Sequence, residues 1–243
     1  MKLKIWQVDA FASKPLEGNP AAIVPLDAWL ADDLMQRIAG ENNLAETAFF
    51  VKAGPGRYGL RWFTPNAEVD LCGHATLASA WVIFNRTDTA LSEARFMTRS
   101  GELVVTRGSS GNVMSLPSAD SEAFTPPAGF AAALGKSFNS IPPTELFISA
   151  KGGAGAKALI AVWETPDQIK ALNPAADLQE VGMQVGAGSL IATAPGGGMP
   201  YDMVSRFFAP YYGVPEDPVT GSAHCALTPF WARRLGKKTL KAR

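Results

Sequence analysis

Histidine and cysteine are scarce in this sequence, with two of each among 243 residues. Two cysteines in a chain of this length do not form a disulfide framework, so we expect a reducing, cytoplasmic setting. Neither charge dominates, because 22 basic residues balance 22 acidic ones. No long run of Lys or Arg occurs before the last few positions, which argues against nucleic acid as a partner.

Long apolar runs are also missing. The most apolar stretch, from Ala75 to Phe84, has about half the length needed to cross a bilayer. The N-terminal residues Met1 to Asp9 alternate like a strand and contain no signal-peptide core. Hydrophobic residues nevertheless make up 47% of the chain, which is enough for a packed core and argues against disorder. We therefore expect a globular protein without a membrane partner.

Two similar passages occur in the two halves of the chain. One runs from Thr64 to Thr76 and the other from Phe208 to Cys225. Each adjoins the end of a strand-like run, carries acidic residues and a Gly close to a His, and leads into an apolar helical pattern. Gly73 and Gly221 are 148 positions apart. A near-constant offset of this kind indicates a duplicated unit.

The order of the expected elements divides the chain into two domains. We predict an N-terminal domain over residues 1–117, a linker over 118–127 that is rich in Ser, Pro and Ala, and a C-terminal domain over 128–243. A helix over Ala75 to Asn85 is apolar on nearly all sides, and such a helix is buried within its surroundings. Three strands follow this helix, whereas none follows its counterpart. The second half is therefore expected to lack its closing strands, through truncation or because a partner chain or the N-terminal strand covers that edge.

The two helix starts are candidate anion sites. A helix N-terminus presents free N–H groups and the positive end of the helix dipole, and a Gly there lets a ligand approach the backbone closely. Two such ends facing one cleft would hold a small anion between the halves. Groups that can move protons stand nearby: Glu46, Asp70, Cys72, His74, Asp217, Ser222, His224 and Cys225. This set suits general acid–base chemistry rather than redox or phosphoryl-transfer chemistry.

Several of these residues have ordinary structural alternatives. Asp70 could cap the following helix, and Asp217 could start a turn before a proline. Glu46 by itself could be a carboxylate at a strand edge. Both histidines of the chain lie in the repeated passages, and this paired placement favours a functional role for His74 in particular, while His224 stays open.

A zinc site is a further alternative for the cysteines and histidines. Cys72-x-His74 and the adjacent pair His224-Cys225 contain suitable ligand types. Their spacing matches neither a structural zinc site nor the usual gap between paired ligands. We therefore predict no metal ligands.

Four blocks of the sequence resemble the phenazine-biosynthesis PhzF-like isomerase family. They are Gly18-Asn19-Pro20-Ala21-Ala22, Glu46-Thr47-Ala48-Phe49, Asp70-Leu71-Cys72-Gly73-His74-Ala75-Thr76 and Glu216-Asp217-Pro218-Val219-Thr220-Gly221-Ser222-Ala223-His224. The blocks occur in order and span nearly the whole chain, so together they are specific. The resemblance implies an α+β fold of the diaminopimelate-epimerase type. In that fold two similar halves each curl a mostly antiparallel sheet around a central helix, and the active site lies in the cleft between them.

The resemblance also implies roles for individual residues. Glu46 matches the proton-transferring acid/base of the family, and His74 and Asp217 match residues that line its cleft. The matched substrate-contacting positions are Asn19, Gly73, Gly221 and Ser222. Cys72 stands where related amino-acid epimerases carry a catalytic thiol, and we include it among the substrate-binding residues. The resemblance implies no cofactor and no metal, and it implies a homodimer.

Three functions follow as predictions. The first is an isomerase in which Glu46, assisted by His74 and Asp217, moves a proton on a small anionic metabolite that bears a carboxylate. The second is an amino-acid-type epimerase that pairs Cys72 with Asp217. The third is a catalytically silent protein that binds small anions. It arises because family members usually continue beyond the Leu-Gly-Lys block at residues 235–237 through an Arg-Gly-Gly segment and a closing hairpin.

Overall fold

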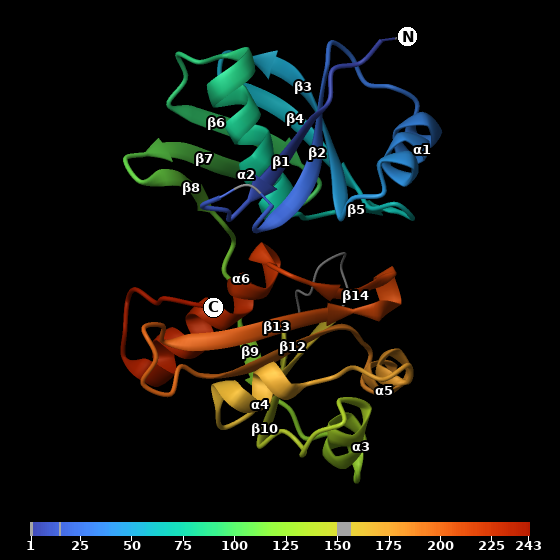
Figure 1. Cartoon of the computed structure of the whole chain (residues 1–243), viewed down its shortest axis with the longest axis vertical. Helices are drawn as coiled ribbons and strands as arrows, with labels where there is room; N and C mark the ends of the chain where they lie inside the picture. The colour runs from blue at the N-terminus through green and yellow to red at the C-terminus, as the bar shows by residue number, and fades with distance from the viewer. Residues whose placement is uncertain (1, 15, 150–156) are drawn as a thin grey trace. The chain divides into compact units, whose positions relative to one another are not determined.

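The computed structural model of the protein describes all residues except 1, 15 and 150–156. The chain divides into two compact units, Met1–Pro117 (unit 1) and Ser118–Arg243 (unit 2) (Figure 1). Each unit has its own sheet and its own buried core. The predicted α+β class with two curled sheets is confirmed. In the described ranges, no helix combines the length and the apolarity needed to cross a membrane.

Unit 1 contains an eight-stranded sheet. Its strands are β1 (Trp6–Ala10), β2 (Asn19–Leu26), β3 (Glu46–Gly54), β4 (Arg57–Phe63), β5 (Glu68–Val69), β6 (Glu93–Thr98), β7 (Gly101–Gly108) and β8 (Gly111–Ser115). They follow the order β1-β2-β3-β4-β6-β7-β8, and β5 pairs with β4 beside this path. Only the β2–β3 and β4–β6 pairs are parallel. The sheet is therefore mostly antiparallel, as predicted.

Two helices cover the two faces of this sheet. Successive side chains of a strand point to opposite faces, so β2 and β3 contribute to both cores. Ile23 and Phe50 join the core around α2 (Gly73–Val82), whereas Val24 and Phe49 join the core beneath α1 (Asp32–Asn42). Nearly all of α2 is buried because strands from both ends of the sheet contact it. The helix continues into a short π-helix, η1 (Ile83–Thr87).

Trp81 departs from the prediction that α2 is buried on all sides. Its exposed fraction is 38%. The edge strands β1 and β8 both contact α2 but do not pair with each other. Trp81 and Leu77 line the hollow that is bordered by residues 7–14 and 111–112. Arg86 covers part of the indole, with its guanidinium carbon 5.3 Å from the ring centroid.

Unit 2 contains a six-stranded sheet in the order β14-β13-β12-β11-β10-β9. The strands are β9 (Ser121–Ala123), β10 (Glu145–Ser149), β11 (Lys157–Val162), β12 (Ala187–Pro195), β13 (Met203–Ala209) and β14 (Val214–Asp217). The helices are α3 (Phe130–Ser137), α4 (Pro166–Ala171), α5 (Leu178–Met183) and α6 (Gly221–Leu235), with a 3-10 turn η3 at Pro210–Tyr212. The segment 118–127, predicted as the linker, contains β9, which pairs with β10.

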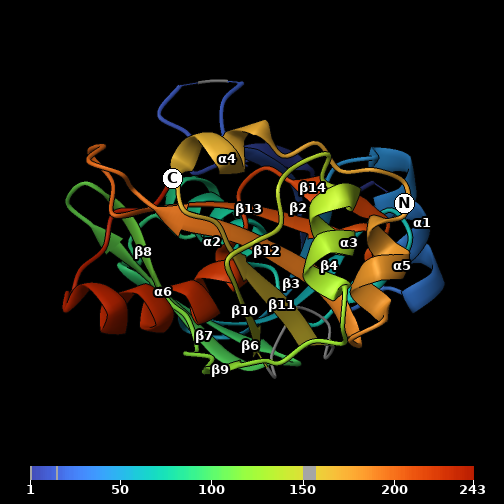
Figure 2. The ribbon, with the colours of Figure 1, turned by 90° about the horizontal axis from the view of Figure 1, so that it is seen from below.

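The sheet of unit 2 is also covered on both faces. Helices α3 and α5 lie side by side (Figure 2) and share a core with Leu190 and Phe208. On the other face, Trp231 of α6 donates an indole hydrogen bond to Thr193 at 3.0 Å. Strand β12 is buried along nearly its whole length, as expected for a central strand with helices on both sides.

The two units repeat one topology. In unit 1, an antiparallel β1–β2 pair, a parallel β2–β3 pair and the antiparallel strands β4 and β5 precede α2. In unit 2, β10 to β14 show the same pairings before α6. After α2 the chain adds β6, β7 and β8. After α6, the described residues contain no named strand, but Ala242 forms an isolated parallel bridge with Met203 at the start of β13.

Pro229 lies inside α6, where we predicted a kink or a shifted start. The helix instead runs continuously from Gly221 to Leu235. Proline has no N–H to donate to the carbonyl four residues earlier, which here belongs to Cys225. That carbonyl accepts a hydrogen bond from the Ala119 amide at 2.9 Å. The segment before β9 thus satisfies the acceptor that the proline leaves open.

Candidate functional site

Glu46 and His74 come together in unit 1 although 28 positions separate them. Glu46 begins β3, and His74 is the second residue of α2. Glu46 Oε2 lies 3.1 Å from His74 Nε2, and the side chains are 16% and 3% exposed. This approach lacks hydrogen-bond geometry, and neither atom has another hydrogen-bond partner among the described residues. A mostly buried carboxylate oxygen and an imidazole nitrogen therefore face each other.

The second ring nitrogen of His74 contacts two further predicted site residues. Nδ1 lies 3.3 Å from Asn19 Nδ2 and 3.5 Å from Cys72 Sγ. An amide N–H can only donate, so Nδ1 accepts in the contact with Asn19. A neutral His74 then carries its proton on Nε2, which faces Glu46. The ring is oriented so that it can present a proton or a hydrogen bond beside the carboxylate.

Strand pairing explains how Asn19 reaches this group. Asn19 begins β2 and lies opposite Ala10 of β1. Gly18, directly before it, has a φ of +82°, and a side chain there would collide with the Ala10 carbonyl oxygen. Glycine adopts this backbone without a side-chain clash. The Gly18-Asn19 pair therefore lets the chain turn tightly into β2 and buries the amide beside His74.

The start of α2 is capped by Cys72, and Asp70 is not the cap. Cys72 has an extended backbone, with φ −142° and ψ 108°, and no side chain accepts a hydrogen bond at the cap. The first turn contains no acidic residue. Such a start leaves N–H groups and the positive end of the dipole for an anion. The structural alternative in which Asp70 caps the helix is thus wrong.

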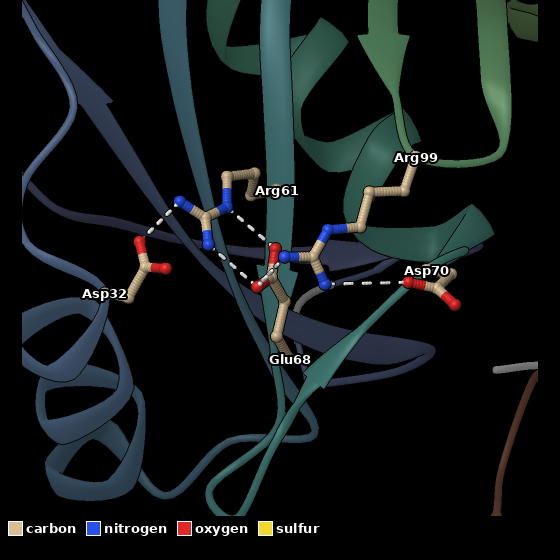
Figure 3. Close-up of polar contacts among 5 residues, drawn as sticks. All are labelled: Asp32, Arg61, Glu68, Asp70 and Arg99. Atoms are coloured by element: carbon tan, nitrogen blue, oxygen red, sulfur yellow. Dashed lines mark hydrogen bonds and ion pairs between the residues drawn. The ribbon is translucent and has the colours of Figure 1, made fainter.

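Two arginines hold the strand and loop that lead into α2 (Figure 3). Arg61 binds both oxygens of Glu68 at 2.7 Å and reaches Asp32 at 2.8 Å. Arg99 contacts Glu68 at 2.7 Å and Asp70 at 3.7 Å. The hydrogen bond to Glu68, followed by that to Asp32, raises the pKa of the Arg61 guanidinium. These contacts fix the chain two to four residues before Cys72.

Arg61→Lys is expected to lower the free energy of unfolding of unit 1 by about 1–3 kcal/mol, the range for losing hydrogen bonds to a charged group. An ammonium cannot reproduce the planar fork that Arg61 forms with Glu68. The arginine side chain is only 19% exposed, so solvent screens the contact weakly. Urea unfolding would measure the change.

Arg37→Lys is the matched control in the same unit. Arg37 contacts Asp33 at 3.6 Å, but both side chains are more than 70% exposed. Exposed pairs of this kind contribute about 0–1 kcal/mol, so this variant is expected to unfold close to the wild type. Equal losses in both variants would contradict the proposed anchoring by Arg61.

Unit 2 gathers its predicted residues at the junction between β14 and α6. Asp217 ends β14, and Gly221 and Ser222 open α6. The Thr220 hydroxyl donates to Asp217 Oδ2 at 2.5 Å. Thr220 is also the N-cap residue of α6, and the sequence analysis missed it. Its signal was the preference of threonine for the position before a helix.

The remaining groups of this junction have structural contacts. His224 Nδ1 lies 2.9 Å from the Thr220 carbonyl oxygen, so that nitrogen donates within the first turn of α6. Burial raises the pKa of the Cys225 thiol, which keeps it neutral at physiological pH. The cleft expected between the halves stays a prediction.

Comparisons with known proteins agree along nearly the whole chain. The sequence model of the phenazine biosynthesis-like protein family, PhzC-PhzF, matches residues 8–242. An uncharacterized isomerase of Pseudomonas aeruginosa is 47% identical over 243 residues, which cover 100% of this chain and 86% of that protein. A crystal structure of a PhzF-family phenazine biosynthesis protein from Enterococcus faecalis has a TM-score of 0.86 and 39% identity, covering 100% of this chain and 86% of that one.

A more distant likeness concerns the fold alone. The crystal structure of a probable proline racemase from Agrobacterium radiobacter has a TM-score of 0.60 at 8% identity, covering 98% of this chain and 79% of that one. It places the two-unit architecture among epimerase-type folds. The family match and the close relatives go further, because they extend over the sequence as well as the backbone. The chain therefore belongs to the phenazine biosynthesis-like (PhzC-PhzF) protein family.

Proposed function

We propose that the protein is an isomerase that moves a proton on a small carboxylate-bearing metabolite, with Glu46 as the acid/base. The observation that carries this proposal is the approach of Glu46 Oε2 to His74 Nε2 at 3.1 Å in a mostly buried setting. A general base works best when its oxygen is positioned and shielded from bulk water. The naming of close relatives as isomerases supports the same class.

The proposed reaction starts with the substrate carboxylate at the N-terminus of α2. Glu46 removes a proton from a carbon next to an unsaturated or carbonyl group. The C–H bond breaks, an O–H bond forms on Glu46, and the electron pair moves into the adjacent π system. Glu46 then returns the proton to a different carbon, so atoms and charge balance. His74 donates a hydrogen bond from Nε2 as charge develops on the substrate.

Unit 1 supplies the acid/base, the imidazole and one anion site in this proposal. Asn19 orients His74, and the backbone of Gly73 lets the carboxylate approach closely. Asp217, Gly221 and Ser222 of unit 2 are proposed as further substrate contacts, following the family resemblance. All proposed steps use side chains and backbone groups of this chain.

Deuterium exchange tests the proposal. The protein would be incubated in D₂O with a panel of small β,γ-unsaturated carboxylates and followed by NMR. We expect deuterium to enter the carbon chain together with migration of the double bond. Ligand binding without exchange across the panel would instead favour the silent anion-binding protein.

A second candidate is an amino-acid-type epimerase that uses Cys72. It is favoured by the 3.5 Å contact between Cys72 Sγ and His74 Nδ1, which places a thiol beside an imidazole. Exchange would then occur at the α-carbon of an amino acid with inversion of configuration. Unchanged turnover of Cys72→Ser would exclude this candidate, and Cys225→Ser is the control for loss of a buried thiol elsewhere.

A further inference from the structure

We propose that Glu46, Cys72 and His74 also form a binding site for one Zn²⁺ ion. One donor atom from each residue lies within 4.8 Å of the donors of the other two. Thiolate, imidazole and carboxylate are the ligand types of protein zinc sites. This proposal departs from the sequence prediction of no metal ligands, because strand β3 adds a third ligand that the local spacing did not reveal.

The Cys72–His74 pair already has the separation of two zinc ligands. Bond lengths of about 2.3 Å for Zn–S and about 2.0–2.1 Å for Zn–N in a tetrahedral site place sulfur and nitrogen about 3.6 Å apart. The observed distance from Cys72 Sγ to His74 Nδ1 is 3.5 Å. The loop conformation before α2 therefore holds these donors ready for one ion.

Glu46 completes a set of three ligands after a small rotation. Its Oε2 approaches Nε2 rather than Nδ1 of His74, and one ion uses one nitrogen of the ring. The donors are nevertheless within 4.8 Å of one another, so rotation about side-chain bonds suffices to bring the carboxylate onto the same ion. Three protein ligands leave a fourth tetrahedral position for water or a small anion.

Burial and charge favour a divalent cation here. His74 and Cys72 are 2% and 5% exposed. The thiolate and the carboxylate together neutralise the two charges of Zn²⁺, which matters because an uncompensated buried charge is costly. Oε2 of Glu46 and Nε2 of His74 are buried without a hydrogen-bond partner in the described parts of the chain. Coordination of one of these atoms would supply an interaction that the free site does not provide.

Bound zinc would occupy groups that proton transfer needs, so the metal-loaded protein is expected to be inactive in exchange. The proposal itself does not rest on the isomerase assignment, because binding is measured on the free protein without substrate. Failure of the exchange assay and failure of metal binding are therefore separate results.

Calorimetric titration of chelator-treated protein with Zn²⁺ is the first test. We expect one equivalent to bind. Cys72→Ser, His74→Asn and Glu46→Gln should each weaken binding by at least the roughly 10–100-fold seen when only an outer partner of a zinc ligand is removed. Cys225→Ser removes the other thiol and should bind Zn²⁺ like the wild type.

Substitution with Co²⁺ gives a direct readout of the sulfur ligand. The wild type and Cys225→Ser should show a thiolate-to-cobalt charge-transfer band that Cys72→Ser lacks, with circular dichroism confirming that each variant is folded. No binding by the wild type would overturn the proposal. So would equal Zn²⁺ affinity in the three ligand variants, or a band that Cys225→Ser loses.

Discussion

Glu46→Gln is expected to slow proton exchange into a substrate by about 10²–10⁴-fold, the usual contribution of a positioned general acid or base. Glutamine keeps the size of the side chain but cannot accept and return a proton in the same way. The N-terminus of α2 is unchanged in this variant, so binding of a carboxylate ligand should be largely retained. The loss is therefore expected in kcat rather than in KM, and NMR of deuterium incorporation would measure it.

Glu41→Gln is the matched control for this experiment. Glu41 lies near the end of α1, five residues before Glu46, and its side chain is exposed. It should exchange like the wild type. Wild-type exchange by Glu46→Gln would remove Glu46 as the proton carrier. If Cys72→Ser then abolished exchange, the epimerase candidate would replace the isomerase.

Trp163→Ala is expected to lower the free energy of unfolding of unit 2 by about 3–5 kcal/mol, the typical cost of truncating a buried aromatic residue. Trp163 is 1% exposed and packs edge-on against Phe138, with ring centroids 5.9 Å apart. Its indole N–H donates to the Ile141 carbonyl at 3.1 Å. Truncation removes the ring contacts, leaves a cavity and leaves that carbonyl without its donor.

Two further variants separate these contributions. Trp163→Phe keeps most of the ring but removes the hydrogen bond, so its loss should fall between those of the wild type and the alanine variant. Met183→Ala, at a side chain that is 43% exposed in α5, should change stability little. Urea unfolding followed separately for each unit is the measurement, because two compact units need not unfold in one transition. A Trp163→Ala variant as stable as Met183→Ala would show that this core tolerates the cavity.

The duplicated architecture could be predicted from the sequence because its signals are local. The Gly73 and Gly221 passages mark equivalent helix starts, and alternating apolar residues mark the strands before them. Those signals located α2 and α6 and gave the order of strands in each unit. Trp81 shows the limit of the same pattern, since an apolar helix periodicity cannot reveal that edge strands β1 and β8 leave one side of the helix open.

The candidate site depended on the sequence for its residue types and on the tertiary structure for its grouping. The repeat and the family blocks singled out His74 and Cys72, and Glu46 rested mainly on the resemblance. Only the parallel pairing of β3 with β2, and the packing of α2 against both, brings Glu46, His74 and Asn19 together. The Arg61–Glu68 contact was likewise invisible locally. Such neighbours are set by strand register and helix packing across long sequence separations, whereas composition and periodicity report only on contacts within a segment.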